Sequence, residues 1–245
     1  MSGKRPKLTW AAYKGCARQR THVVEATIGR DEDELIIVGL GGSMAKVSRS
    51  RAALVAALEG AAGAGARTEL LDIRELDLPM YNPDEDRPTE AAARLLESCR
   101  AADGMVWSSP MYQGSISGAL KNALDWLHLL RDEEPPFLAD KVIGLISAAG
   151  GTQGLQAINT MEFAVRALRG WAVPYVVPVA GAARVFDADG EVLDQTVAMQ
   201  LKTLGGETVR VAEKFASDHS LHHEDECAKA AERVATATGT TIGEG

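Results

Sequence analysis

The chain has 245 residues, 46% of them apolar, and its formal net charge is −8 at pH 7. That length suits one substantial hydrophobic core, so we expect one domain with extensions. The acidic balance gives the protein as a whole no bias toward nucleic acid or an anionic membrane, and no apolar run reaches the roughly 20 residues of a membrane-spanning helix.

The three cysteines, Cys16, Cys99 and Cys227, lie far apart and belong to no motif. An odd, sparse count favours a reducing compartment over a disulfide framework, and incidental thiols are the simplest interpretation. The first 20 residues lack the apolar region of a secretory signal. We therefore expect a cytoplasmic protein.

The two ends of the chain differ in composition from its middle. The first 30 residues are basic, with Glu25 as their only acidic residue and with Lys4, Arg5, Lys7, Lys14, Arg18, Arg20 and Arg30. Such a block is most often a mobile arm, and a transit peptide or an arm that clasps an oligomer are the alternatives. The polar C-terminal end predicts a frayed helix and then disorder. We expect a basic extension over 1–34, the folded domain over 35–217 and a polar tail over 218–245.

Apolar, β-branched runs alternate with stretches of helical spacing through the middle of the chain. The runs lie at 35–40, 67–73, 104–109, 141–148 and 173–179, and the helical stretches at 49–63, 89–102, 117–130, 154–170 and 194–217. Continuous apolar strands are buried on both faces, as in a parallel sheet covered by helices. The pattern predicts an α/β domain with a doubly wound sheet of five parallel strands.

Ligands of such sheets bind at the carboxyl ends of the strands, near the switch in strand order. The first, third and fourth strands each run into a loop rich in glycine and polar residues. We call these loops exit 1 ("GLGGSMAKVSRSR", 39–51), exit 3 ("SSPMYQGSISG", 108–118) and exit 4 ("ISAAGGTQG", 146–154).

Exit 1 leads into a helix, whose free N–H groups suit a phosphate dianion. It fits neither the P-loop nor the G-x-G-x-x-G fingerprint, which would need glycine at Met44. Its hydroxyl groups and positive charges belong to Ser43, Lys46, Ser48, Arg49, Ser50 and Arg51. A plain Gly-rich turn with a serine N-cap is the alternative, but three hydroxyls and three cations exceed what capping needs.

Exits 3 and 4 have features of a site for a flat ligand. In exit 3, Gly114 and Gly118 allow close backbone approach, and Tyr112 could stack on a ligand or line its rim. Exit 4 is a pliant polar loop around Gly150 and Gly151, for which a plain strand-to-helix turn is the alternative. The exits contain no nucleophile–base motif and no histidine, so an enzyme built on them would rely on a cofactor.

Together these exits resemble the NAD(P)H-dependent FMN reductase family of flavodoxin-like proteins. Family members open with a loop like G-S-L-R-x-x-S that holds the flavin phosphate, and Gly42, Ser43, Met44 and Ser48 match its frame. A longer family stretch resembles T-P-E-Y-N-G-S-I-P-G-x-L-K-N-A-I-D-W. It matches "SPMYQGSISGALKNALDW", residues 109–126.

The resemblance covers roughly residues 35 to 217 and leaves out both termini. Segments 72–84 and 186–194 look like the family's equivalents after the second and fifth strands. Two positions depart from the family pattern. Ala45 stands where arginine is often found, so the other cations of exit 1 would supply the counter-charge. Met111 stands where some members carry glutamate.

The resemblance implies a flavodoxin-like fold with strand order 2-1-3-4-5, and FMN with its phosphate on exit 1 and its ring along exits 3 and 4. NADPH or NADH would pass hydride to flavin N5. The reduced flavin would then leave, to feed a flavin-dependent monooxygenase, or reduce a second acceptor such as a quinone, an azo dye, chromate or an organoarsenical. The implied cofactor-binding residues are Gly42, Ser43, Lys46, Ser48, Ser50, Arg51, Pro110, Met111, Tyr112, Gln113, Gly114, Ser147, Gly150, Gly151, Gln153 and Gly154.

Family members are commonly homodimers or homotetramers whose subunits help to close the flavin site. The apolar helix over 117–130 is the candidate interface, and its Trp126 is interpreted as a core or interface aromatic. Backbone N–H groups near Gly150 and Gly151 would stabilise negative charge at flavin N1 and O2.

Two other function classes stay open. A flavodoxin-type electron carrier without a pyridine nucleotide site would also be acidic, although the basic groups of exit 1 and the long exit 3 motif favour the reductase. His219, His223 and Cys227 would share one face of a helix and could bind a metal ion. A polar helix end is the simpler interpretation, and we expect no metal.

Overall fold

The structure is a computed structural model that describes the backbone of residues 34–85 and 87–238, and the side chains as far as residue 216. Its five strands form one parallel sheet in the order β2-β1-β3-β4-β5. The strands are β1 Ile36–Gly41, β2 Arg67–Asp72, β3 Gly104–Pro110, β4 Val142–Ala148 and β5 Trp171–Val179. The predicted doubly wound sheet and its strand order are confirmed.

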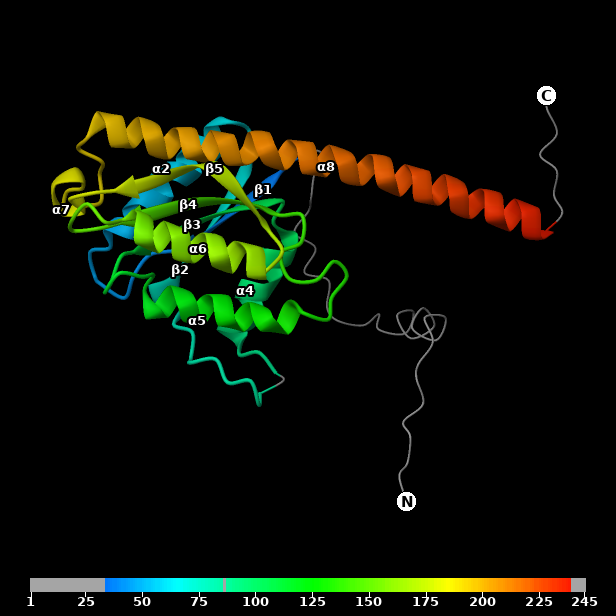
Figure 1. The fold of residues 1–245 in the computed structure, drawn as a ribbon, viewed down its shortest axis with the longest axis horizontal. Helices are drawn as coiled ribbons and strands as arrows, with labels where there is room; N and C mark the ends of the chain where they lie inside the picture. The colour runs from blue at the N-terminus through cyan, green and yellow to red at the C-terminus, as the bar shows by residue number, and fades with distance from the viewer. Residues whose placement is uncertain (1–33, 86, 239–245) are drawn as a thin grey trace, which may run out of the picture. The chain divides into compact units, whose positions relative to one another are not determined.

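Helices cover both faces of the sheet (Figure 1). On one face lie α2 Arg49–Gly63 and α8 Gln195–Thr238, and on the other lie α4 Glu90–Ala101, α5 Gly118–Trp126 and α6 Leu155–Ala167. Short helical segments complete the domain: α3 Ile73–Leu76, the 3-10 helix η2 Leu127–Leu130 and α7 Ala182–Val185. Strand side chains alternate between the two cores, since Val38 and Leu40 face α4 and α5 whereas Ile37 faces α2 and α8.

Three of these helices begin at a hydroxyl N-cap. Ser48, Thr89 and Ser117 precede α2, α4 and α5, and each side chain accepts a hydrogen bond from the backbone N–H three residues further on. Such a cap satisfies one of the free N–H groups of the first turn and contributes about 1 kcal/mol. Residues 49, 90 and 118 are thereby fixed as the first helical positions.

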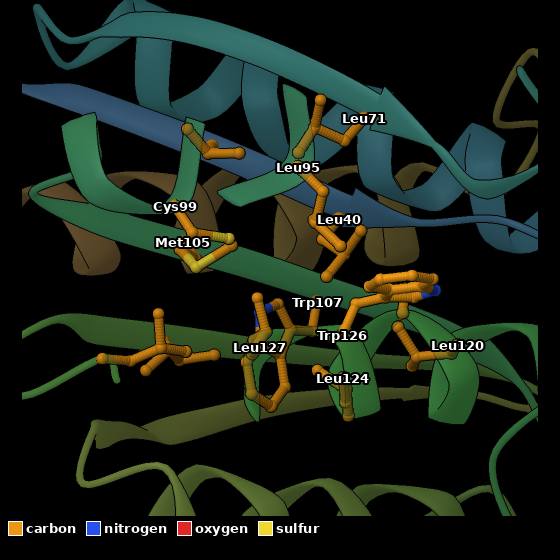
Figure 2. Packing of buried hydrophobic residues seen from close by; sticks show 14 of the residues in the cluster. Leu40, Leu71, Leu95, Cys99, Met105, Trp107, Leu120, Leu124, Trp126 and Leu127 are labelled. Atoms are coloured by element: carbon orange, nitrogen blue, oxygen red, sulfur yellow. The ribbon is translucent and has the colours of Figure 1, made fainter. Parts of the chain in front are cut away.

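The apolar stripe of α5 is buried inside the chain itself. Leu120, Trp126 and Leu127 are fully buried between α5, η2 and the sheet (Figure 2). The indole N–H of Trp126 donates to the Pro79 carbonyl oxygen at 2.9 Å, and its ring meets the edge of Tyr81 at a centroid distance of 5.4 Å. Trp126 is therefore a core residue. The sheet and the loop after α3 cover the apolar stripe, so the stripe itself is not available to another subunit. The helix over 117–130 as a subunit interface stays a prediction.

On the other face, α2 and α8 cross at very close range. A methyl group built on Gly205 of α8 would overlap the Ala57 carbonyl oxygen of α2, and one on Gly60 would overlap the Lys202 carbonyl oxygen of α8. The two backbones touch directly, so only glycine fits at these positions. The contact anchors α2, and with it the helix start that follows exit 1.

The C-terminal helix is longer than expected. We predicted a helix over 194–217, but α8 continues to Thr238, through most of the segment predicted to fray and then become disordered. The side chains of His219, His223 and Cys227 lie outside the described residues, as does the basic extension apart from Glu34. The division into arm, domain and tail stays a prediction.

Cys99 is the one cysteine whose side chain the structure describes. It lies in α4, fully buried against the sheet, and this burial raises the pKa of its thiol to about 12. A thiol that stays protonated and inaccessible agrees with an incidental role. Within the described ranges, no helix is both long and apolar enough to cross a membrane.

Candidate functional site

Exits 1, 3 and 4 meet at the carboxyl edge of the sheet and are joined there by hydrogen bonds. The Gly42 N–H donates to the Ser108 carbonyl oxygen at 3.2 Å, and the Ser108 hydroxyl donates to the Ser50 carbonyl oxygen at 2.7 Å. The Met111 N–H donates to the Ala148 carbonyl oxygen at 3.1 Å. These bonds make one continuous surface from the three loops that the sequence singles out.

The three serines of exit 1 form a chain of hydroxyl groups at the start of α2. The Ser43 hydroxyl donates to that of Ser48 at 3.0 Å, and the hydroxyls of Ser48 and Ser50 lie 3.2 Å apart. The Arg51 N–H donates to Ser48 Oγ at 3.3 Å. Ser48 is the N-cap of α2, as the alternative interpretation of this loop predicts. Ser43 and Ser50 are buried and Ser48 is half-buried, so Ser48 is the most accessible of the three at the helix start, where a phosphate would bind. The phosphate site stays a prediction.

The cations of exit 1 divide into two kinds. Arg51 Nε pairs with the buried Asp72 carboxylate at 2.7 Å, so its charge is largely neutralised. Lys46 and Arg49 are exposed and form no ion pair with any described residue. They are the available counter-charges for an anion, and Ala45, in the position where the family often has arginine, adds none.

Exit 3 projects as a tight hairpin. Tyr112 and Ser115 exchange both backbone hydrogen bonds, at 2.9 and 3.0 Å. The two residues between them have positive φ, 49° at Gln113 and 79° at Gly114, which is the pattern of a type I′ turn. The turn holds Tyr112, with 52% of its surface exposed, at the rim of the carboxyl edge.

We predict opposite effects for substitutions at the two turn positions. Gly114→Ala should cost about 1 kcal/mol, because alanine is strained at this φ, and the new methyl group would press on Gln156 Oε1 at 3.2 Å. Gln113→Asn should stabilise by about 0.5 kcal/mol, since Asn-Gly is a preferred pair in such turns. Urea denaturation measures the free energy of unfolding of both variants. Equal midpoints for the two variants would contradict the role of these positions in the turn.

Exit 4 is shaped by a buried serine. The Ser147 hydroxyl donates to the Gly154 carbonyl oxygen at 2.8 Å and is fully buried, so it helps to fold the loop. Pro110 is also buried, at the end of β3. By contrast, Gly150 and Gly151 are exposed, and a Cβ built on either meets only open space. Exit 4 therefore offers bare backbone along this edge.

A cavity of about 490 Å³ opens beside exit 1. Its walls are the start of α2, the segment after β2 and the segment that follows α7; they comprise residues 45–49, 51, 52, 55, 72, 74, 75 and 186–191. No residue of exit 3 or exit 4 is among these lining residues. We name it the exit 1 cavity.

Two walls of this cavity come from the segments 72–84 and 186–194, which the sequence indicates only as resembling family segments. The sequence pattern does not connect either segment to exit 1. The strand order supplies the connection, because β2 lies next to β1 and places Asp72 opposite Gly41. The segment after α7 is closed by an antiparallel bridge between Phe186 and Val192. Its contact with exit 1 depends on tertiary packing, for which local sequence carries no signal.

Comparison with protein families gives a direct match. The family described as NADPH-dependent FMN reductase matches residues 35–184. Among characterised relatives, an NAD(P)H-dependent FMN reductase of Pseudomonas aeruginosa is 32% identical over 180 residues, covering 70% of this chain and 94% of its own length. An NADPH azoreductase of a Bacillus species is 37% identical over 114 residues, 46% of this chain and 61% of the relative. The NADPH-dependent FMN reductase ArsH of Shigella flexneri is 30% identical over 160 residues, 65% of this chain and 62% of the relative.

Solved structures agree on the fold. RosB, solved with a bound 8-demethyl-8-formylriboflavin-5′-phosphate intermediate, superposes with a TM-score of 0.63 at 17% identity, over 86% of this chain and 90% of RosB. The flavoenzyme FerB of Paracoccus denitrificans, an NAD(P)H:acceptor oxidoreductase, gives a TM-score of 0.62 at 23% identity, over 74% of this chain and 98% of FerB. The matching family model spans β1 to α7, including all three exits. The chain belongs to the NADPH-dependent FMN reductase family.

Proposed function

We propose that this protein is an NAD(P)H-dependent FMN reductase that passes electrons to a small-molecule acceptor. The observation that carries the proposal is the hydroxyl chain of Ser43, Ser48 and Ser50 at the start of α2, in a chain of this family. Family membership also favours the reductase over the electron-carrier alternative. The azoreductase and ArsH relatives are only about three-fifths covered by this chain, so their activities enter here as proposals.

The residues of the carboxyl edge fit FMN. Hydroxyl groups, free helical N–H groups and Lys46 suit the phosphate. Tyr112 stands at the rim for a flat ring, and the open backbone at Gly150 and Gly151 allows the ring to approach without a side chain in the way. When bound, the flavin supplies the redox chemistry by accepting hydride from NAD(P)H and passing the electrons on.

The protein's own contribution is binding and orientation. The hydrogen bonds between exits 1, 3 and 4 hold the phosphate loop and the ring loops at fixed separation, which is how a rigid edge orients a cofactor. Backbone N–H groups near Gly150 and Gly151 would stabilise negative charge on the ring. His128, the one histidine with a described side chain, lies against Tyr81 and belongs to none of the exits.

The acceptor and the partners belong to the same proposal. Curated relatives are named as an azoreductase, a quinone oxidoreductase and ArsH, which supports a small organic or inorganic acceptor such as a quinone, an azo dye, chromate or an organoarsenical. Release of reduced flavin to a monooxygenase is the other route. We propose a cytoplasmic homodimer or homotetramer whose interface lies elsewhere than the buried stripe of α5.

The test is NADPH and NADH oxidation by the purified chain with added FMN, followed at 340 nm against a panel of free FMN, quinone, azo dye, chromate and ferric chelate. We expect flavin binding and FMN-dependent oxidation with at least one acceptor. If the protein binds FMN and the bound flavin is bleached by dithionite but not by NADPH, the protein is an electron carrier. If it has no affinity for flavin, the proposal is refuted altogether.

A further inference from the structure

The exit 1 cavity shares a wall with the candidate phosphate site. Ser48 belongs to the hydroxyl chain and also lines the cavity, together with Lys46 and Arg49. The volume of the exit 1 cavity, about 490 Å³, falls within the range of small-molecule sites, roughly 300–1,000 Å³. A ligand in it would therefore lie next to the flavin phosphate, on the side that exits 3 and 4 do not reach.

Three cations without an ion pair line the cavity, and Glu75 of α3 lies beside one of them. Lys46 and Arg49 come from exit 1, and Arg74 comes from α3 after β2. All three are exposed, and none forms an ion pair within the described part of the chain. Arg51 differs, because Asp72 neutralises it at 2.7 Å. Three unpaired cations around one hollow are suited to a phosphate group.

Carboxylates from another segment also line the cavity. Asp189 and Glu191 line the cavity from the segment after α7, and neither is in an ion pair with a described residue. Asp187 also lines it, but its Oδ1 accepts the backbone N–H groups of residues 189 and 191, at 2.9 and 2.8 Å, and so shapes the turn. Carboxylates near a phosphate site can accept hydrogen bonds from ribose hydroxyls, as an acidic residue does in dinucleotide-binding folds.

We infer that the exit 1 cavity binds an adenosine phosphate, with the phosphate toward Lys46, Arg49 and Arg74 and the ribose toward Asp189 and Glu191. The inference rests on the proposed flavin function, since it extends the same phosphate loop. The carboxylates that line the cavity together with the cations distinguish this ligand from a simple anion, which would gain nothing from them. The half-buried Val55 provides apolar surface for the base.

Two sources of this group are compatible with the proposed reaction. The adenylate half of FAD would reach the cavity directly through the flavin phosphate. The adenosine end of NADPH would reach it from the ring side, past exits 3 and 4. The absence of exit 3 and exit 4 residues from the lining favours FAD, and binding measurements separate the two.

The experiment uses the full chain, its Arg74→Ala variant and an Arg94→Ala control. Arg94 is an exposed arginine of α4 on the opposite face of the sheet, with a side-chain exposure of 58%. Affinities for FMN and FAD are measured by flavin fluorescence, and affinities of the FMN-saturated protein for AMP and 2′,5′-ADP by calorimetry. KM for NADPH is measured with FMN present.

If FAD is the source, FAD binds at least tenfold tighter than FMN, and Arg74→Ala abolishes that difference while the affinity for FMN stays within about twofold. If NADPH is the source, FAD and FMN bind alike, 2′,5′-ADP binds the FMN-saturated protein, and Arg74→Ala raises KM for NADPH about tenfold. FMN binding with neither pattern, or equal effects of Arg74→Ala and Arg94→Ala, overturns the inference. If the wild-type protein does not bind FMN at all, the result refutes the proposed function instead.

Discussion

Replacing Gly205 with alanine is expected to destabilise the domain by about 3 kcal/mol. The new methyl group would overlap the Ala57 carbonyl oxygen and lie 2.7 Å from the Ala61 backbone nitrogen. Both are main-chain atoms of α2, so no rotamer change relieves the overlap and the two helices must separate. Separation would open the core that Leu54, Leu201 and their neighbours form on this face of the sheet.

The next residue provides the matched control. Gly206 lies in the same turn of α8, but a Cβ built there meets nothing within 4 Å. Gly206→Ala should therefore raise the free energy of unfolding by about 1 kcal/mol, the usual helix-propensity gain. Urea denaturation of the two variants compares the same substitution with and without the overlap. Midpoints that shift in the same direction would show that α2 and α8 do not cross this closely in solution.

The three central strands were predictable because each is a continuous apolar run that is buried at every position. β3 was expected at 104–109 and spans Gly104–Pro110, buried at every position. β5 was predicted less well, since it begins at Trp171 and not at residue 173. It lies at the edge of the sheet and is only partly buried. Its run is also interrupted by Pro174, so the sequence does not show where the strand begins. The strand order followed from the family resemblance and could not be derived from local pattern.

Features that depend on contacts between distant segments were not predictable. The stripe of α5 is as apolar as a subunit interface would be. Only its contacts with the sheet, Pro79 and Tyr81 show that residues of the same chain bury it. The exits were located correctly, because the carboxyl ends of parallel strands meet at one edge. Their neighbours across the exit 1 cavity, Arg74 and Asp189, lie far apart in sequence and carry no shared motif.

Replacing Ser48 with alanine is expected to weaken FMN binding by about 10- to 100-fold, the loss of one hydrogen bond to a charged group. Ser48 is the middle member of the hydroxyl chain, bonded to Ser43 and in contact with Ser50, so its removal also frees both neighbours to rotate. The same substitution deletes the N-cap of α2 and should cost about 1 kcal/mol of stability. Flavin titration and urea denaturation measure the two effects separately.

Thr89→Ala separates capping from phosphate binding. Thr89 Oγ1 accepts the Ala92 N–H at 3.3 Å, the same distance at which Ser48 Oγ accepts the Arg51 N–H. Thr89 caps α4, which packs on the opposite face of the sheet from α2. We expect both variants to lose similar stability, and only Ser48→Ala to lose FMN affinity. If Ser48→Ala binds FMN as tightly as Thr89→Ala does, exit 1 is a capped turn and the flavin phosphate must be held by other groups, first among them Lys46 and Arg49.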